Sequence, residues 1–167
     1  GVEKMTALPT EGVTDVLASA ADCLYEVPAG LTFPGIYGAL AKAHMDRYET
    51  SLNHLLKVGI KNHNNGALNP KAQFNVSIQG LMQRRQERAR QRGEPVPDWR
   101  EEMDFLNDPQ ANPWIAWPLR LYDCAPITDG AACVLLVASE LAANFTDKPV
   151  QLAGTGQATG RPLHDAE

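Results

Sequence analysis

The chain has 167 residues, of which 44% are hydrophobic, 21% charged and 7% aromatic, and its formal net charge is -5 with an isoelectric point near 5.4. This composition excludes disordered, fibrous and membrane-spanning chains and is typical of a soluble globular domain. The acidic excess argues against a nucleic-acid partner, because phosphate binding requires clustered positive charge. Neither a secretory signal nor an apolar run near the roughly 20 residues of a membrane span is visible, so we expect a cytoplasmic protein without a membrane partner.

Helical spacing of apolar residues predicts three helices in the first half of the chain. They cover residues 11–26, residues 35–48 and a segment that begins after Thr50, its predicted N-cap. The second is rich in glycine and alanine, which indicates close packing against another helix. The apolar face of the third continues to His63, because the apolar positions before it recur at intervals of three and four.

Residues 79–104 are charged and rich in amides. We predict a solvent-facing helix and a proline-containing linker, inserted at the surface rather than built into the core. Farther along, the apolar run 131–138 predicts a strand covered on both faces. A short helix over 139–143 and a second strand over 150–153 complete the expected elements.

Three cysteines form an odd and sparse set, which is typical of reduced intracellular thiols rather than of a disulfide framework. Cys23 on a predicted helix and Cys133 in the apolar run are expected in the core. Cys124 precedes that run in a loop, with no histidine near it in sequence. A thiol that lines the loop or the core is therefore the favoured interpretation, and a nucleophile is the alternative.

The four histidines show no metal-ligand spacing, so no metal site is predicted. His63 lies beside Asn62, Asn64 and Asn69. We interpret it as a structural histidine hydrogen-bonded to these amides, with a ligand-facing role as the alternative. The glycine-rich residues 154–160 lack the Lys-Ser/Thr of a phosphate-binding loop and are interpreted as a connector.

Four blocks of sequence, in this order, resemble the thiolase superfamily. They are GVEKMT (1–6), GLTFPGIYG (30–38), KNHNNGALNPKAQF (61–74) and PLRLYDCAPITDGAACVLL (118–136). The resemblance covers nearly the whole chain except residues 79–104, and the last two blocks are the most specific. The branch most similar to this chain is that of the sterol-carrier-protein-type thiolases and their acetyl-CoA acetyltransferase relatives.

The resemblance implies an α/β fold of the thiolase type, with two similar halves and αβαβα layers, of which this chain is an incomplete central piece. It implies the following boundaries: 1–6 the end of a core strand of the first half, 7–117 a mostly helical loop domain with 79–104 as a charged insertion, 118–147 the last strand and helix of the first half, and 148–167 the start of the second half.

The implied activity is acyl transfer with Claisen condensation or thiolysis, in lipid metabolism, on a coenzyme A thioester substrate and without a covalently bound cofactor. By resemblance, the residues expected to contact acyl-CoA are Phe33, Tyr37, His63, Asp123, Cys124 and Ala125. The catalytic cysteines and histidine of the family lie outside the matched blocks. No residue of this chain is therefore assigned a catalytic role, and the chain alone is expected to be inactive.

Two alternatives stay open. One is a noncatalytic or split thiolase-like subunit completed by a partner chain. The other is a thiolase-fold aldolase or lyase that acts on sterol side-chain thioesters. In each case we expect a homo-oligomer, such as a dimer, or assembly with the missing thiolase halves, because the run 131–138 has apolar side chains that this segment alone does not cover.

Overall fold

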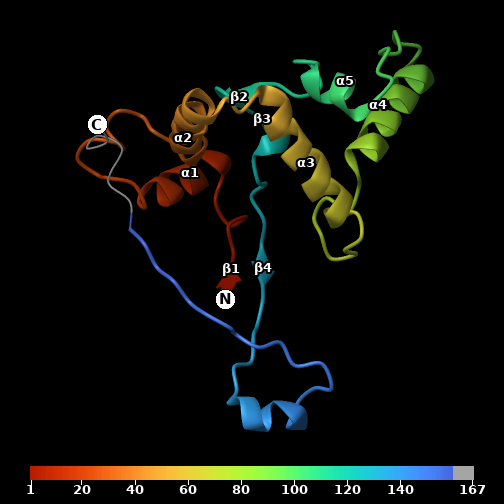
Figure 1. Cartoon of the computed structure of the whole chain (residues 1–167). Helices are drawn as coiled ribbons and strands as arrows, with labels where there is room; N and C mark the ends of the chain where they lie inside the picture. Colours follow the sequence, from red (N-terminus) through yellow and green to blue (C-terminus); the bar gives the residue numbers. More distant parts are fainter. Residues whose placement is uncertain (160–167) are drawn as a thin grey trace.

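Helices make up most of the first part of the chain in a computed structural model that describes residues 1–159. They are α1 (Thr10–Ala18), α2 (Phe33–Tyr48), α3 (Leu52–Gly66), α4 (Ile78–Arg92) and α5 (Glu102–Asn107). Figure 1 shows them gathered into one body. No helix within the described range is long and apolar enough to cross a membrane.

Two short antiparallel sheets and two 3-10 helices accompany the helical body in the described range. One sheet pairs β1 (Val2–Glu3) with β4 (Gly130–Ala131), and the other pairs β2 (Trp114–Ala116) with β3 (Leu119–Arg120). The 3-10 helices are η1 (Leu121–Asp123) and η2 (Ser139–Asn144), and η2 confirms the short helix predicted at 139–143. The structure therefore combines helices with small sheets, which is compatible with an α/β fold.

Helix α1 ends at Ala18, well before the end of the predicted helix 11–26. The Asp22 Oδ1 accepts the backbone N–H groups two and three residues further on, at 2.8 and 2.7 Å. This local turn offers the backbone an alternative to the helix. Cys23 lies in the turn and is exposed, so its predicted place in the core is wrong.

Helices α2 and α3 confirm the helices predicted from periodicity. At the start of α2, the Thr32 hydroxyl accepts the Gly35 N–H at 3.3 Å, and a proline occupies the first turn. Helix α3 has Ser51 as its N-cap rather than Thr50, and the Ser51 N–H donates to His54 Nδ1 at 3.2 Å. The predicted buried face of α3 is confirmed, with Leu56 and Gly59 buried and His63 half-buried.

Glycines in α2 and α3 admit the backbone of another segment. For α2, the small residues were predicted to pack against another helix, but Gly38 meets a turn instead. A Cβ at Gly38 of α2 would lie 2.9 Å from the carbonyl oxygen of Trp117, in the turn between β2 and β3. A Cβ at Gly59 of α3 would lie 3.2 Å from the carbonyl oxygen of Tyr122 in η1. The β2–β3 hairpin and η1 therefore rest directly on the two helices.

The principal hydrophobic cluster includes one face of α4, a helix that was predicted to lie at the surface. Its buried members are Leu56, Ile78, Met82, Phe105, Leu106 and Ala111. Helix α4 turns its apolar residues toward α3 and α5, and the Arg85 guanidinium lies 5.6 Å from the centroid of the Phe105 ring. The prediction that residues 79–104 are outside the core is wrong for this face of α4, because its density of arginines conceals an apolar stripe.

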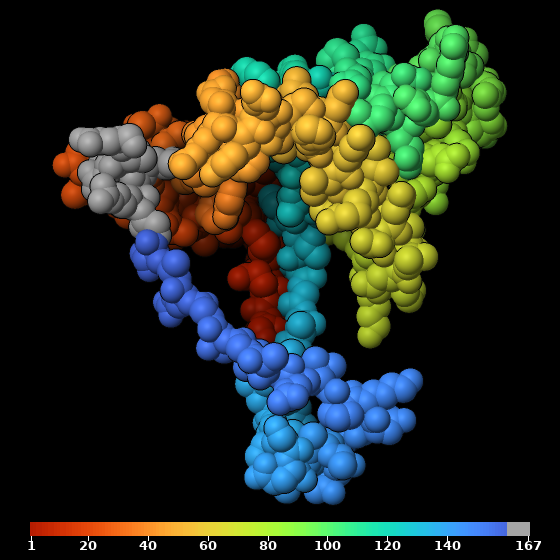
Figure 2. Space-filling view, in the orientation of Figure 1, coloured from red at the N-terminus to blue at the C-terminus, as the bar shows by residue number. Residues whose placement is uncertain are grey.

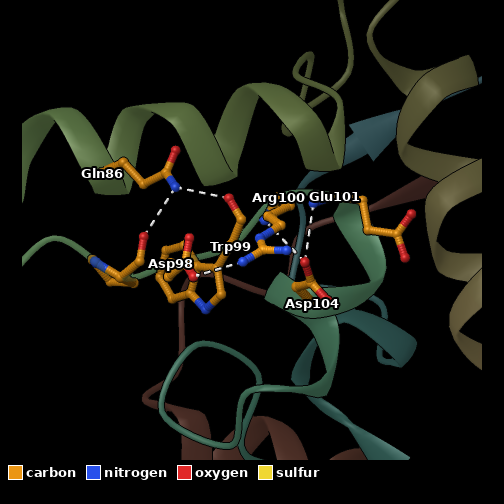
Figure 3. A network of polar contacts seen from close by, with 7 residues as sticks. Gln86, Asp98, Trp99, Arg100, Glu101 and Asp104 are labelled. Carbon is orange, nitrogen blue, oxygen red and sulfur yellow. Dashed lines mark hydrogen bonds and ion pairs between the residues drawn. The ribbon is translucent and has the colours of Figure 1, made fainter.

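The linker after α4 is fastened to that helix (Figure 3). The Gln86 side-chain amide donates to the carbonyl oxygens of Pro97 and Trp99, at 3.1 and 3.0 Å. The Trp99 indole N–H in turn donates to the Asp108 carboxylate at 2.9 Å. The Asp104 carboxylate accepts the N–H groups of the two residues that precede α5, at 2.9 and 3.2 Å. The linker is therefore held by specific hydrogen bonds.

Asp129 joins the two ends of the helical body. Its carboxylate accepts the Thr6 hydroxyl at 2.6 Å and the N–H groups of Thr6 and Met5 at 2.9 and 2.8 Å. These hydrogen bonds favour the charged carboxylate and lower the pKa of Asp129, and the bond from the Thr6 hydroxyl has the largest effect. Beside them, Gly1 and Ala132 exchange two backbone hydrogen bonds. Residues 1–6 are thereby fixed alongside 129–132.

The apolar run after β4 does not form the predicted buried strand. Residues 132–138 leave the helical body in an extended, exposed course, and 150–153 likewise form no strand (Figures 1 and 2). Cys133 is exposed rather than in the core. Among the most exposed large side chains are Val134, Leu135, Leu136, Val150 and Leu152. A strand needs neighbouring strands to pair its backbone groups, and among the described residues this run has backbone partners only as far as Ala132.

We expect Met82→Ala to lower the free energy of unfolding by about 2–5 kcal/mol, because the truncation leaves a cavity in the buried cluster. Urea denaturation followed by circular dichroism measures this loss. The control is Arg84→Ala on the exposed side of α4, which should change the stability by no more than about 0.5 kcal/mol. Equal effects of the two substitutions would show that α4 is not packed in this core.

We expect the chain to self-associate at micromolar concentration through residues 132–138, because their apolar side chains and unpaired backbone groups are both exposed. Size-exclusion chromatography should show dimers or larger species, and Leu136→Lys should shift them toward monomer. Leu68→Lys, at an exposed leucine outside this segment, is the matched control and should have no such effect. A monomeric wild-type chain would contradict this expectation.

Candidate functional site

A pocket of about 520 Å³ lies between α1, the first turns of α2 and the loop that follows η1. Phe33 and Tyr37 contribute from α2, with ring centroids 5.8 Å apart. Asp123 contributes from the end of η1, and Cys124 and Ala125 contribute from the loop after it. The structure therefore brings five of the six residues expected at an acyl-CoA site into one pocket lining, although they come from distant parts of the sequence.

Helix α1 supplies pocket residues that the sequence interpretation missed. The additional lining residues are Met5, Thr10, Val13, Thr14, Leu17, Pro34, Leu119, Pro126 and Ile127. The apolar spacing of α1 shows that it has a buried face, but the spacing does not reveal which segment that face meets. Most of the lining is apolar, and it contains no lysine, arginine or histidine.

His63 does not line this pocket. Its ring is half-buried, with Nδ1 3.3 Å from the carbonyl oxygen of Val76, and it meets the Tyr122 ring edge-on at a centroid distance of 5.6 Å. The neighbouring amides were predicted as hydrogen-bond partners, and Val76 takes that place instead. The reason is that the chain folds back after α3 and brings the start of α4 next to the ring.

The Asp123 carboxyl is half-buried in the wall of the pocket. Burial raises its pKa, while the Arg120 N–H, at 2.8 Å from Oδ2, and the positive charge of Arg120 act in the opposite direction. The net effect is a carboxyl that binds its proton at a higher pH than an exposed aspartate does. The charged form of Asp123 is therefore less stable in this wall than it is in water.

The Cys124 thiol is not set up as a nucleophile. Burial raises its pKa, and the negative charge of the adjacent Asp123 raises it further. Reactive cysteines instead have a lowered pKa, from a neighbouring cation or a helix N-terminus. The geometry supports the interpretation of Cys124 as a lining thiol.

Neither the metal-binding residue types nor the glycine-rich segment forms a site among the described residues. No group of three or more metal-binding side chains gathers among residues 1–159. The glycine-rich segment has no regular structure over 154–159, and its last residue, like His164 and the end of the proposed boundary 148–167, lies outside the described residues.

Comparison with known proteins adds an independent line of observation. The chain is 35% identical to an acetyl-CoA acetyltransferase from Methanothermobacter thermautotrophicus over 99% of its own length and 36% of that protein. It is 25% identical to human sterol carrier protein 2 over 93% of the chain and 23% of that protein. The chain belongs to the thiolase superfamily.

Within the thiolase superfamily, the similarity is to proteins of the sterol-carrier-protein type. A steroid side-chain-cleaving aldolase from Thermomonospora curvata is 27% identical over 88% of the chain and 32% of that protein. The thiolase-like chain thus spans about a third or less of the length of these relatives. No family model and no solved structure matches it.

We expect His63→Ala to lower the free energy of unfolding by more than about 1 kcal/mol, because it removes ring packing and leaves the Val76 carbonyl without this partner. Thermal melting measures the loss, and calorimetry measures coenzyme A binding in parallel. An unchanged melt together with tenfold weaker binding, equivalent to about 1.4 kcal/mol, would assign the residue to the ligand site instead.

Proposed function

We propose that this chain provides a wall of the acyl-CoA site in a thiolase-like acyltransferase. The observation that carries the proposal is the pocket in which Phe33 and Tyr37 face the Asp123–Ala125 loop. The acetyl-CoA acetyltransferase name of a relative matched over 99% of the chain supports a coenzyme A thioester as the substrate. The full reaction would be acyl transfer, with Claisen condensation or its reverse.

The character of the pocket supports binding of an uncharged part of the thioester. Its lining is mostly apolar, contains no lysine or arginine, and includes a carboxyl whose raised pKa reflects the cost of charge there. Lysine and arginine side chains are the usual partners of phosphate groups, and this lining has neither. The pantetheine arm or the acyl chain therefore fits this pocket better than the nucleotide end does.

Catalysis in this proposal needs groups beyond the pocket. Acyl transfer through a covalent intermediate requires an activated nucleophile and a base within hydrogen-bond reach. The pocket offers Cys124 with a raised pKa and no histidine. We assign the covalent step to the cysteines and histidine that the family resemblance places elsewhere, and we assign binding to this chain.

The proposed architecture follows the boundaries given by the resemblance. Residues 7–117 form the helical loop domain, 118–147 the last strand and helix of one half, and 148–167 the start of the next. The exposed apolar side chains of 132–138 support assembly with further polypeptide, either a second copy or thiolase segments of a partner chain. A cytoplasmic setting agrees with three unpaired cysteines.

A lyase acting on sterol side-chain thioesters is the second candidate. The match to a steroid side-chain-cleaving aldolase over 88% of the chain favours it. The two candidates differ in the acyl group, so relative affinity for acetoacetyl-CoA and for a coenzyme A thioester with a bulky alicyclic acyl group separates them.

We expect the purified chain to bind acetoacetyl-CoA without thiolysing it. Tyr37→Ala should weaken binding about tenfold, because it removes an aromatic wall of the pocket. Isothermal titration calorimetry measures the affinity, and the loss of the acetoacetyl-CoA enolate absorbance in the presence of coenzyme A measures turnover.

Tyr48→Ala is the matched control, since this exposed tyrosine lies on the same helix but not in the pocket lining. Equal affinities of the two variants would contradict the proposed site. Turnover by the chain at ordinary enzyme rates, abolished by Cys124→Ala, would overturn the assignment of Cys124 as a lining thiol.

A further inference from the structure

Arg120 is a buried cation at the end of β3, with a relative exposure of 8%. Its guanidinium donates to the carbonyl oxygens of Leu106 and Asn107 at 3.1 and 3.0 Å, and its central carbon lies 3.9 Å from the centroid of the Trp114 ring. These carbonyls belong to the last turn of α5, where the helix leaves such groups without internal partners. Helix-end carbonyls and an aromatic face thus stabilise the buried charge.

Arg120 is also connected to the pocket wall through its backbone. Its backbone N–H donates to Asp123 Oδ2 at 2.8 Å, which fixes the conformation of η1. Asn112 makes a parallel link, because its side chain donates to the Leu106 carbonyl at 2.9 Å and accepts the Tyr122 N–H at 3.0 Å. The end of α5 is therefore joined to η1 by two buried side chains. The residues that follow η1 directly are Cys124 and Ala125 of the pocket.

We propose that Arg120 is a positioning residue for the acyl-CoA site. Arg120 holds η1 against the end of α5 and thereby places the Asp123–Ala125 wall opposite Phe33 and Tyr37. This inference rests on the proposed function of that pocket. Arg120 itself is absent from the pocket lining, so it acts through the backbone that it fixes.

The geometry requires arginine rather than any cation. The guanidinium Nη1 donates to both the Leu106 and Asn107 carbonyls while the planar face of the group lies on the Trp114 ring. A lysine ammonium keeps the charge, but it lacks the planar face that lies on Trp114, and its nitrogen ends one bond short of the position that Nη1 occupies at the two carbonyls. Arg120→Lys therefore separates the effect of geometry from the effect of charge.

The test uses the full chain with Cys23→Ser and Cys133→Ser, in which Cys124 is the remaining thiol. Two quantities are measured: the dissociation constant for acetoacetyl-CoA and the pH profile of Cys124 alkylation by iodoacetamide. We expect Arg120→Lys to weaken binding about tenfold, because the contact with the Trp114 ring is lost and the shorter side chain no longer holds both carbonyls of α5. The alkylation midpoint should move down toward that of an ordinary thiol, because a displaced loop buries Cys124 less.

Arg100→Lys is the matched control, because the side chain of Arg100 is 82% exposed, and it should leave both quantities unchanged. A purely structural role would lower the melting temperature of Arg120→Lys without moving the alkylation profile of the folded protein. That result, or unchanged binding, would overturn the inference.

Trp114→Phe provides a second variant if Arg120→Lys does not fold. Trp114 is 45% exposed, and the smaller ring weakens the contact with the guanidinium while the carbonyl hydrogen bonds remain. A smaller shift of both quantities in the same direction supports the inference, and no shift overturns it. If the parent chain itself fails to bind acetoacetyl-CoA, the proposed function fails, whereas the alkylation profile still reports whether Arg120 places the loop.

Discussion

Direct contact between the backbone of the β2–β3–η1 segment and two helices determines how the rest of the body is arranged. Gly38 and Gly59 make this contact possible, because a side chain at either position would meet a carbonyl oxygen of that segment. With the hairpin on α2 and η1 on α3, the loop after η1 reaches the first turns of α2. The pocket between them therefore depends on Gly38 and Gly59, which lack side chains, as well as on the aromatic residues that line it.

Periodicity predicted the helices well where one face of a helix carries the apolar residues. Helices α2 and α3 have the expected positions. Helix α4 was predicted as a helix but misplaced at the surface, because its arginines dominate its composition while Ile78, Met82 and Ala89 are buried. The end of α1 was missed, because the Asp22 turn is a hydrogen-bonding effect of one side chain and not a feature of the apolar pattern.

The strand predicted at 131–138 illustrates what a local apolar pattern cannot predict. An apolar run indicates that a segment must be covered, but the pairing that makes it a strand comes from other segments. Within the described residues such pairing ends at Ala132, which exchanges backbone hydrogen bonds with Gly1 next to the β1–β4 pair.

The pocket residues illustrate the same limit for function. Phe33, Tyr37 and the Asp123–Ala125 loop were singled out by resemblance to a family, because spacing alone cannot bring together residues so far apart in the chain. For His63, the local sequence pattern predicted the position of the side chain but not its hydrogen-bond partner. Its place on the buried face of α3 followed from periodicity, while its partner Val76 depended on the path of the chain after the helix.

The Asp129 carboxylate, with its three hydrogen bonds to Met5 and Thr6, makes the helical body an insertion with adjacent ends. The polypeptide enters and leaves this body through neighbouring extended segments, so everything from residue 7 to residue 128 forms one closed excursion. Because the entropy of closing a loop grows slowly with its length, such an excursion can gain or lose residues over evolutionary time at small thermodynamic cost. In this chain the two ends are held together by the pairing of Val2 with Ala131 and of Glu3 with Gly130.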